Sequence, residues 1–172
     1  MSDTVLRLAG VIRESIVDGP GIRFTVFVQG CPHRCPGCHN PQSHDFEGGS
    51  DCSIEKLMQE IQRDPLLQGV TFSGGEPFCQ AKALAELGHR IKHERNFDLI
   101  VYTGYTYEQL CQGLTDHPEW KELLDITDYL VDGPFVLDQR DLELHFRGSR
   151  NQRILDMAKT QEAGRPVPAD FS

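Results

Sequence analysis

The sequence predicts an α/β protein in which parallel strands alternate with helices. Short apolar runs of strand length recur along the 172 residues, and segments with the spacing of amphipathic helices lie between them. Strands separated by helices imply parallel β-α units joined by right-handed crossovers. Polar or glycine-rich turns follow four of the expected strands. A chain of this length is expected to form a single domain with a substantial core.

The expected elements follow one another in a regular order. The β-branched and aromatic run at 22–28 predicts a central strand, and Ser53 caps a helix whose apolar residues recur at helical spacing. Thr106 and Gln109 match a capping box that opens a short helix, and Pro118 suits the first turn of the next helix. Further strands are expected at residues 69–73, 99–102, 129–131 and 142–146, and a second long helix at residues 81–93.

Composition and charge exclude several classes of function. Lys and Arg number 17 against 26 Asp and Glu, and the net charge of −9 argues against a general nucleic-acid binder. No apolar stretch approaches the ~20 residues of a membrane span, and the N-terminal residues lack the layout of a signal peptide. The expected location is the cytoplasm, where six cysteines indicate metal or redox chemistry more than disulfides.

Three cysteines form the most informative motif of the chain. Cys31, Cys35 and Cys38 have the spacing C-x3-C-x2-C directly after the strand expected at 22–28. Three thiolates on one short loop can hold three irons of a [4Fe–4S] cube and leave the fourth open, whereas electron-transfer clusters are usually closed by a fourth cysteine. Because an open iron can bind a small molecule, the spacing indicates chemistry at the cluster.

Two other interpretations of the triplet stay open. One is a three-ligand zinc site with water in the fourth position, and the other is a disulfide framework. Zinc motifs usually contain two C-x2-C pairs or histidines at set distances, and this sequence has no second pair. His33 and His39 are possible ligands, but both lie close to cysteines on a tight loop. The spacing favours the cluster over zinc.

Polar or glycine-rich segments follow the first four expected strands. They are the cysteine loop, Ser73-Gly-Gly-Glu-Pro77, Thr103-Gly104 and Asp132-Gly-Pro134. Parallel α/β sheets place ligand sites at the carboxyl ends of their strands, so these segments are expected to converge on one site. The 73–77 turn alone is weak evidence, because glycines and proline also suit an ordinary tight turn. Its backbone groups, with Glu76, could also receive a ligand ammonium.

Together, the triplet and the Gly-Gly-Glu-Pro turn make the chain resemble the radical S-adenosylmethionine (SAM) enzymes. The segment 17–24, Val-Asp-Gly-Pro-Gly-Ile-Arg-Phe, is similar to a motif of glycyl-radical-enzyme activases. The segments 131–135 and 146–152 are similar to parts of the proteins that activate anaerobic ribonucleoside-triphosphate reductase. These pieces run from about residue 10 to 155. The interval before Gly74 holds only Cys52 beyond the triplet, which leaves no room for additional clusters.

The resemblance implies a fold and a reaction. The fold is an incomplete β/α barrel of parallel strands with helices outside, formed by one domain, residues 1–172, with a loose tail from about residue 161. The reaction is reductive cleavage of SAM at a [4Fe–4S] cluster to a 5′-deoxyadenosyl radical, which generates a glycyl radical on the glycyl radical subunit of anaerobic ribonucleoside-triphosphate reductase. Flavodoxin or ferredoxin would donate the electron. Two alternatives stay open: a radical SAM enzyme with a small-molecule substrate, such as a deazapurine-forming carbocyclic synthase, and a non-enzymatic iron–sulfur or zinc-binding module.

The resemblance also assigns roles to residues, none of which acts as an acid or base. Iron ligation falls to Cys31, Cys35 and Cys38. Contacts to SAM are expected at Gly37, Cys38, His39, Ser73, Gly74, Gly75, Glu76, Thr103 and Asp132. Admission of the protein substrate is expected at Asp18, Gly19, Pro20, Gly21 and Arg23. One departure is Gly37, because many members carry an aromatic residue before the third cysteine.

Other reactive residues are expected to have structural or solvated roles. Cys79 and Cys111 lie in helical patterns and are expected to be small core residues. His89 and His93 are one turn apart on a helix, but the residue after His89 is not the glutamate of a zinc-protease motif, so a solvated face is expected. Arg147, Arg150 and Arg153 could form a basic spot or a solvated face, and the resemblance implies that their segment lies near the partner or the SAM site.

Overall fold

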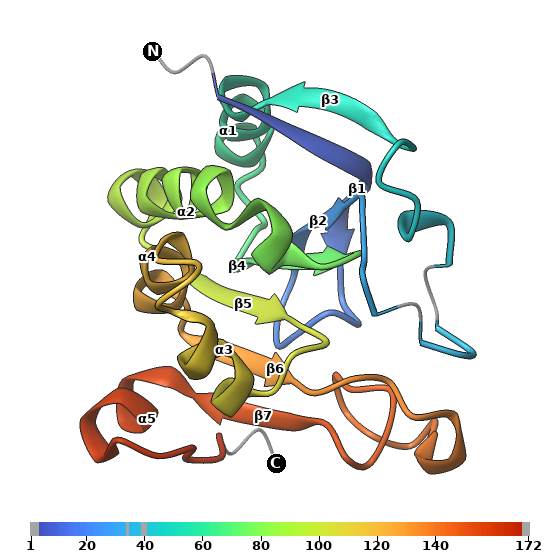
Figure 1. Ribbon diagram of the computed structural model, residues 1–172. Helices are drawn as coiled ribbons and strands as arrows, with labels where there is room; N and C mark the ends of the chain where they lie inside the picture. The colour runs from blue at the N-terminus through green and yellow to red at the C-terminus, as the bar shows by residue number, and fades with distance from the viewer. Residues whose placement is uncertain (1–3, 34, 39–40, 170–172) are drawn as a thin grey trace.

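The chain forms one mixed sheet with helices packed along one of its faces (Figure 1). The computed structural model describes residues 4–33, 35–38 and 41–169. The strands lie in the order β3-β1-β2-β4-β5-β6-β7. They are β1 Val5–Ser15, β2 Arg23–Val28, β3 Ser50–Ser53, β4 Gly69–Gly74, β5 Asp98–Tyr102, β6 Tyr129–Asp132 and β7 Arg153–Asp156.

The middle of the sheet is parallel and its edges are antiparallel. β2, β4, β5 and β6 pair in parallel and are the four strands that the sequence predicts first, which confirms the α/β class. β1, β3 and β7 run antiparallel to their neighbours, so the expectation of parallel strands throughout is corrected. Antiparallel neighbours can be joined by short loops, whereas parallel ones need a crossover, and β1 meets β2 through the short loop 16–22.

The strand predicted at residues 142–146 is wrong. The chain forms turns there, Leu142 is 78% exposed, and Phe146 has a φ of 63°, which is not an extended conformation. The last strand is β7, which pairs with β6 in the register Asp132 to Arg153. Alternating apolar residues form a strand only where a partner strand is within reach, and the alternating pattern alone does not contain that information.

The helices confirm most of the predicted starts. They are α1 Ile54–Arg63, α2 Ala81–Arg95, α3 Tyr107–Gly113, α4 Glu119–Ile126 and α5 Met157–Ala163. The Ser53 hydroxyl accepts a hydrogen bond from Lys56 N at 3.1 Å, and Thr106 and Gln109 form the complete capping box. Pro118 lies one position before its helix, at the N-cap. No helix within the described ranges has the length and apolar character needed to cross a membrane.

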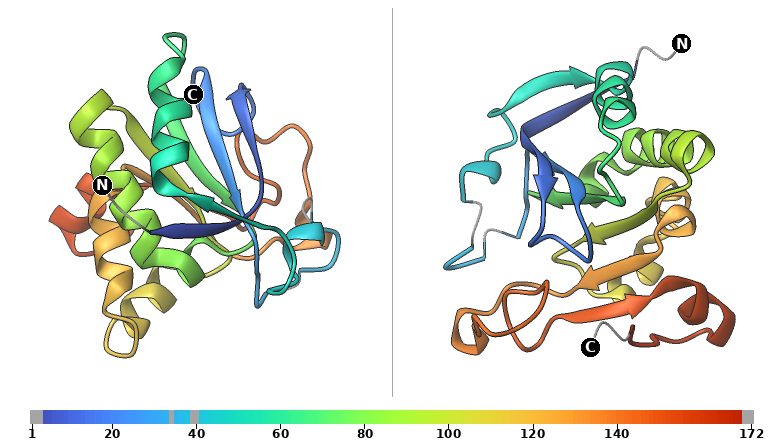
Figure 2. Two further views of the ribbon diagram at one scale, coloured as in Figure 1. Left: turned by 90° about the horizontal axis from the view of Figure 1, so that it is seen from above. Right: turned by 180° about the vertical axis from the view of Figure 1, so that it is seen from behind.

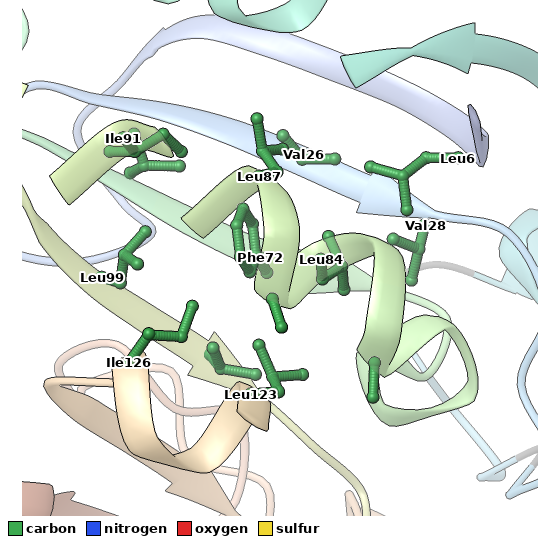
Figure 3. Packing of buried hydrophobic residues seen from close by; sticks show 14 of the residues in the cluster. Leu6, Val26, Val28, Phe72, Leu84, Leu87, Ile91, Leu99, Leu123 and Ile126 are labelled. Atoms are coloured by element: carbon green, nitrogen blue, oxygen red, sulfur yellow. The ribbon is translucent and has the colours of Figure 1, made fainter. Parts of the chain in front are cut away.

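The core lies between the sheet and the helices on its covered face (Figure 3). Leu84, Leu87 and Ile91 come from one side of α2 and are fully buried, as is Phe72 of β4 beneath them. Burial of each such side chain contributes about 1.5–3 kcal/mol. α4 packs beside α2 and adds Leu123 to the same layer. This core holds the parallel strands in place and leaves their other face free of helices (Figure 2).

The segment after α5 returns to the sheet. Asp156 N donates to Val167 O at 2.9 Å, and Ala169 N donates to Ile154 O at 2.8 Å. Leu155 and Pro168 form an isolated antiparallel bridge. The region predicted to be a loose tail from about residue 161 thus begins inside α5, and its described part runs along β7.

Candidate active site

The cysteine loop begins where β2 ends, at the carboxyl edge of the parallel strands (Figure 1). Cys31 is buried, Cys35 and Cys38 are half-buried, and Cys38 N donates to Cys35 O at 3.1 Å. Gly37 lies between the last two, and a Cβ built there would lie 2.7 Å from Leu137 Cδ1. Leu137 could move aside, but Gly37 has a φ of 75°, which favours glycine at the position where an aromatic residue is common. The predicted SAM contact His39 lies outside the described residues.

The three cysteines line one cavity, which fits them as ligands of a cluster. Three other strand ends contribute to its lining: Gly75 follows β4, Thr103 and Gly104 follow β5, and Gly133 follows β6. No three His, Cys, Asp or Glu side chains converge on a single metal position within the described part of the chain. A [4Fe–4S] cube does not need such convergence, because each thiolate binds its own iron at a separate corner. The donor set and its placement therefore fit a cube better than one zinc ion.

Burial is the main influence on the pKa of the Cys35 thiol. It raises the pKa of this thiol more than a backbone hydrogen bond at Phe135 lowers it, and the neighbouring Cys38 raises it further. A thiol that binds a metal is deprotonated outright by the charge of the ion. The pocket alone therefore favours the neutral thiol, and iron would supply the positive charge that favours the thiolate.

The Gly-Gly-Glu-Pro turn at the end of β4 packs directly on the start of the cysteine loop. Gly75 N donates to Val28 O and Glu76 N donates to Gly30 O, both at 2.8 Å. A Cβ at Gly75 would lie only 2.3 Å from Gly30 O, so no larger residue fits without moving the backbone next to Cys31. The glycines are thus required by this close approach as well as by any ligand, and the two motifs form one rigid unit.

Glu76 is fully buried and its carboxylate is already hydrogen-bonded to the chain. Oε1 accepts from Gly104 N at 2.8 Å and lies 2.7 Å from His33 Nε2, and both oxygens lie 2.9 Å from the donating hydroxyl of Thr103. Oε2 also accepts from Phe78 N at 3.0 Å. Glu76 and Thr103 therefore connect the cysteine loop, the β4 turn and the end of β5. His33, a possible zinc ligand by sequence, contacts this carboxylate.

Asp132 has a different environment from the one predicted. It is 1% exposed, accepts from Arg153 Nε at 3.0 Å and from Tyr107 N at 2.7 Å, and does not line the cysteine cavity. Arg153 also pairs with Glu108 at 2.6 Å, and the hydrogen bonds to both carboxylates raise the pKa of its guanidinium. Its hydrogen bonds connect the Asp132 carboxylate to β7 and α3.

A second cavity of about 350 Å³ adjoins the first on the face of the sheet that the helices leave open. Ser73 lines it, together with Val17 and Asp18 of the β1–β2 loop and Leu142 of the segment after β6. Four residues line both cavities: Cys38, Tyr102, Phe135 and Gln152. The sequence does not single out Tyr102, although its position at the end of β5 marks it, whereas Gln152 falls in a segment that carries the family resemblance.

Two residues of the loop predicted to admit a protein substrate, Asp18 and Arg23, have different environments in the structure. Asp18 lines the second cavity, its carboxylate accepts from the Ser15 hydroxyl, and its backbone oxygen accepts from Thr71 Oγ1 at 2.8 Å. Arg23 lies elsewhere than expected, because it is 1% exposed and pairs with Asp98 at 2.8 Å. It also donates to Pro20 O at 3.1 Å, so it anchors the 19–21 turn to the sheet and does not face an opening.

The three remaining cysteines do not line the cysteine cavity. Cys52 is on the edge strand β3, and Cys111 is on α3. Cys79 and Cys111 are exposed, so the expectation that they are core residues is wrong. Neighbouring groups nevertheless desolvate the Cys79 sulfur, which raises the pKa of its thiol to about 12. Cys79 is therefore exposed through its other atoms, while its sulfur is poorly solvated.

Comparison with known proteins agrees with this site. Residues 17–155 match a family model described as a 4Fe-4S single cluster domain, the class that the cysteine loop and its strand-end cavity define. The anaerobic ribonucleoside-triphosphate reductase-activating proteins of Haemophilus influenzae and Pasteurella multocida are 34% and 38% identical over 146 residues, which cover 81% of this chain and 90% of each relative. The chain belongs to the radical SAM superfamily, in the family of the anaerobic ribonucleoside-triphosphate reductase-activating proteins.

Two further proteins are similar to this chain, one over a smaller share of its own length and the other with a low structural similarity score. The pyruvate formate-lyase 1-activating enzyme of Escherichia coli is 35% identical over 150 residues, which cover 83% of this chain and 57% of that enzyme. The crystal structure of QueE from Escherichia coli superposes with a TM-score of 0.45 at 19% identity, covering 59% of this chain and 54% of that one.

Proposed function

We propose that this protein is a cytoplasmic activase that generates a glycyl radical on an anaerobic ribonucleoside-triphosphate reductase. When bound, the reduced cluster supplies one electron that cleaves SAM to methionine and a 5′-deoxyadenosyl radical, which takes a hydrogen atom from a glycine of the partner. Flavodoxin or ferredoxin would supply the electron. The observation that carries the proposal is the rigid contact between the cysteine loop and the Gly-Gly-Glu turn in a chain of this family.

The protein's own part in this reaction is ligation, orientation and exclusion of water. Cys31, Cys35 and Cys38 would hold three irons and leave the fourth for the amino and carboxyl groups of SAM. The Gly74–Gly75 backbone would face the methionine end, beside the same cavity. Glu76 and Thr103 would act mainly by holding this backbone in place, because their polar atoms already bond to one another.

The second cavity would receive the reactive end of SAM and the glycine of the partner. It adjoins the cysteine cavity through Cys38 and lies on the face without helices, which is where an incomplete barrel would be open. Val17 and Leu142 line it and are 70% and 78% exposed. We assign these two apolar residues to the rim that contacts the reductase, in place of the buried Arg23.

The test measures two products after anaerobic reconstitution. The protein is mixed with the reductase, SAM and a reductant, and both 5′-deoxyadenosine and the glycyl radical are quantified, the radical by electron paramagnetic resonance. The double variant Val17→Ser/Leu142→Ser should keep uncoupled SAM cleavage and lose glycyl radical, because hydrogen transfer requires near contact with the glycine. The matched control is Leu66→Ser, at an apolar residue that is 60% exposed and lies before β4, away from both cavities.

The same measurement separates the alternatives. In the unmodified protein, SAM cleavage without any glycyl radical on the reductase would favour a small-molecule radical SAM enzyme. Absence of SAM cleavage in the unmodified protein, with or without iron–sulfur absorption, would favour a non-enzymatic iron–sulfur or zinc-binding module.

A further inference from the structure

The segment that returns from the cysteine loop to the sheet carries a histidine without an evident structural role. The Nε2 atom of His44 is buried and has no hydrogen-bond partner among the residues that the structure describes. Leaving such a nitrogen unpaired costs about 1–3 kcal/mol, and native structures contain few such groups. His44 lines the same cavity as Cys31, Cys35 and Cys38.

The backbone of His44 is bonded to the strand end that places the first cysteine. Cys31 N donates to His44 O at 3.2 Å, and Gly30 N donates to Ser43 O at 2.6 Å. Ser43 is fully buried. The position of His44 relative to Cys31 is therefore set by the main chain and does not depend on a flexible connection.

A buried glutamine holds the same segment from the other side. Gln29 is 4% exposed, and its side-chain amide donates to Gln42 O at 3.0 Å and to Asp45 O at 2.6 Å. These two carbonyls flank Ser43 and His44. The bonds restrain the segment on both sides of the histidine, and so they hold the ring at the cavity wall.

We propose that His44 donates a hydrogen bond from Nε2–H to a sulfur of the cluster, either a bridging sulfide or a cysteine thiolate. The inference rests on the proposed function, since it requires the cluster in this cavity. When a cluster is bound, its sulfurs become hydrogen-bond acceptors at the wall of this cavity, and one of them would accept a hydrogen bond from His44 Nε2. His44 would then adjust the reduction potential of the cluster without being one of its ligands.

The direction of the effect follows from charge. Hydrogen bonds to cluster sulfurs are among the groups that set its reduction potential. The reduced cluster carries one more negative charge than the oxidised cluster, so a donor stabilises it more and raises the potential. Removing the donor should make the cluster harder to reduce.

The test compares reduction potentials of reconstituted proteins in the absence of SAM. In His44→Phe, which keeps a ring but removes the donor, the ratio of reduced to oxidised cluster at a given potential should fall about tenfold, which is 59 mV for a one-electron couple. His44→Gln keeps an N–H donor and should restore part of the shift. His89→Phe, at an exposed position on α2, should match the unmodified protein.

A spectroscopic measurement on the unmodified protein tests the contact without any variant. With [15N]histidine, the reduced cluster should show a weak nitrogen coupling and an exchangeable proton coupling that disappears in D₂O, and both should be absent from His44→Phe. A coupling strong enough for direct iron–nitrogen bonding would overturn the proposal, as would equal potentials in the unmodified protein and His44→Phe. If the unmodified protein assembles no cluster, the proposed function fails and this inference fails with it.

Discussion

Two buried carboxylates at strand ends of the same sheet have partners of different kinds. Glu76, after β4, is fully buried and accepts hydrogen bonds from the uncharged Thr103 hydroxyl and Gly104 amide. Asp132, at the end of β6, is 1% exposed and is paired with the Arg153 guanidinium. The first network is joined to the cysteine loop through His33, and the second is joined to the edge strand β7.

The difference indicates that the two networks at the carboxyl edge of the sheet have different functions. The network of Glu76 connects the segments that would hold the cluster and SAM, so its loss should disturb chemistry. The network of Asp132 compensates a buried charge and holds the last strand, so its loss should disturb stability. Sequence position alone suggests equal roles, because both carboxylates follow a parallel strand.

The largest contrast is expected in cluster assembly. Cys35→Ala should abolish the [4Fe–4S] cluster, because two remaining thiolates cannot hold three irons, while Arg153→Ala should retain it. Iron and sulfide analysis with visible absorption after anaerobic reconstitution decides this. Cys111→Ala, at an exposed cysteine of α3, is the control, and a full cluster in Cys35→Ala would show that the ligands are misassigned.

The next effect concerns stability at the second network. Arg153→Ala should lower the free energy of unfolding by about 3 kcal/mol, the low end for a broken buried pair, since the Asp132 charge is left unpaired while Arg153 itself reaches solvent. Urea unfolding measures it. Arg150→Ala should change stability by less than about 0.5 kcal/mol. Adding Asp132→Asn to Arg153→Ala should recover part of the loss, and no recovery would contradict the pairing argument.

Glu76→Gln tests the first network. The amide would direct N–H groups at donors that now face a carboxylate oxygen, at a cost of about 2 kcal/mol. Formation of 5′-deoxyadenosine should also fall, by up to about 100-fold if the reacting groups are displaced by 1 Å. Asp132→Asn is the matched comparison, which should leave SAM cleavage close to normal. Equal losses of cleavage in both variants would remove the distinction between the networks.

The smallest effect is a pH dependence at the edge of the second network. The hydrogen bond from Arg153 is the main cause that lowers the pKa of Glu108 below its ordinary 4.5. The folded pKa lies below the unfolded one, so this contribution is present above about pH 4.5 and is lost as the pH falls through the folded value. Because Glu108 is exposed, it should be below about 1 kcal/mol.

Urea unfolding of the unmodified protein and Glu108→Gln measures this contribution. The difference in stability between them should be larger at pH 7 than at pH 3.5. A difference that does not change with pH would mean that the ion pair with Arg153 contributes nothing to acid sensitivity.

Local patterns of the sequence determined a large part of this molecule. Ser53 and the Thr106–Gln109 box mark helix starts correctly because caps depend on residues within one turn. The four parallel strands were predictable because each is a short apolar run between turn signals. The Cys31–Cys38 spacing and the Gly-Gly-Glu turn indicated the family for the same reason, since each motif lies on one short stretch of chain.

Only the tertiary structure shows the features that require contact between segments distant in the sequence. The antiparallel strands β1, β3 and β7 depend on their pairing partners. The burial of Arg23 against Asp98 and Thr71 likewise depends on segments that are distant in the sequence. The pairing of Asp132 with Arg153 and the Nε2 atom of His44, unpaired among the described residues, are also visible only in the folded structure. A local pattern reports the conformational preference of its own residues, whereas the partner of a buried charge or polar nitrogen is set by how the chain returns to it. The sequence therefore identified the chemistry of this protein, and only the fold showed which side chains support it.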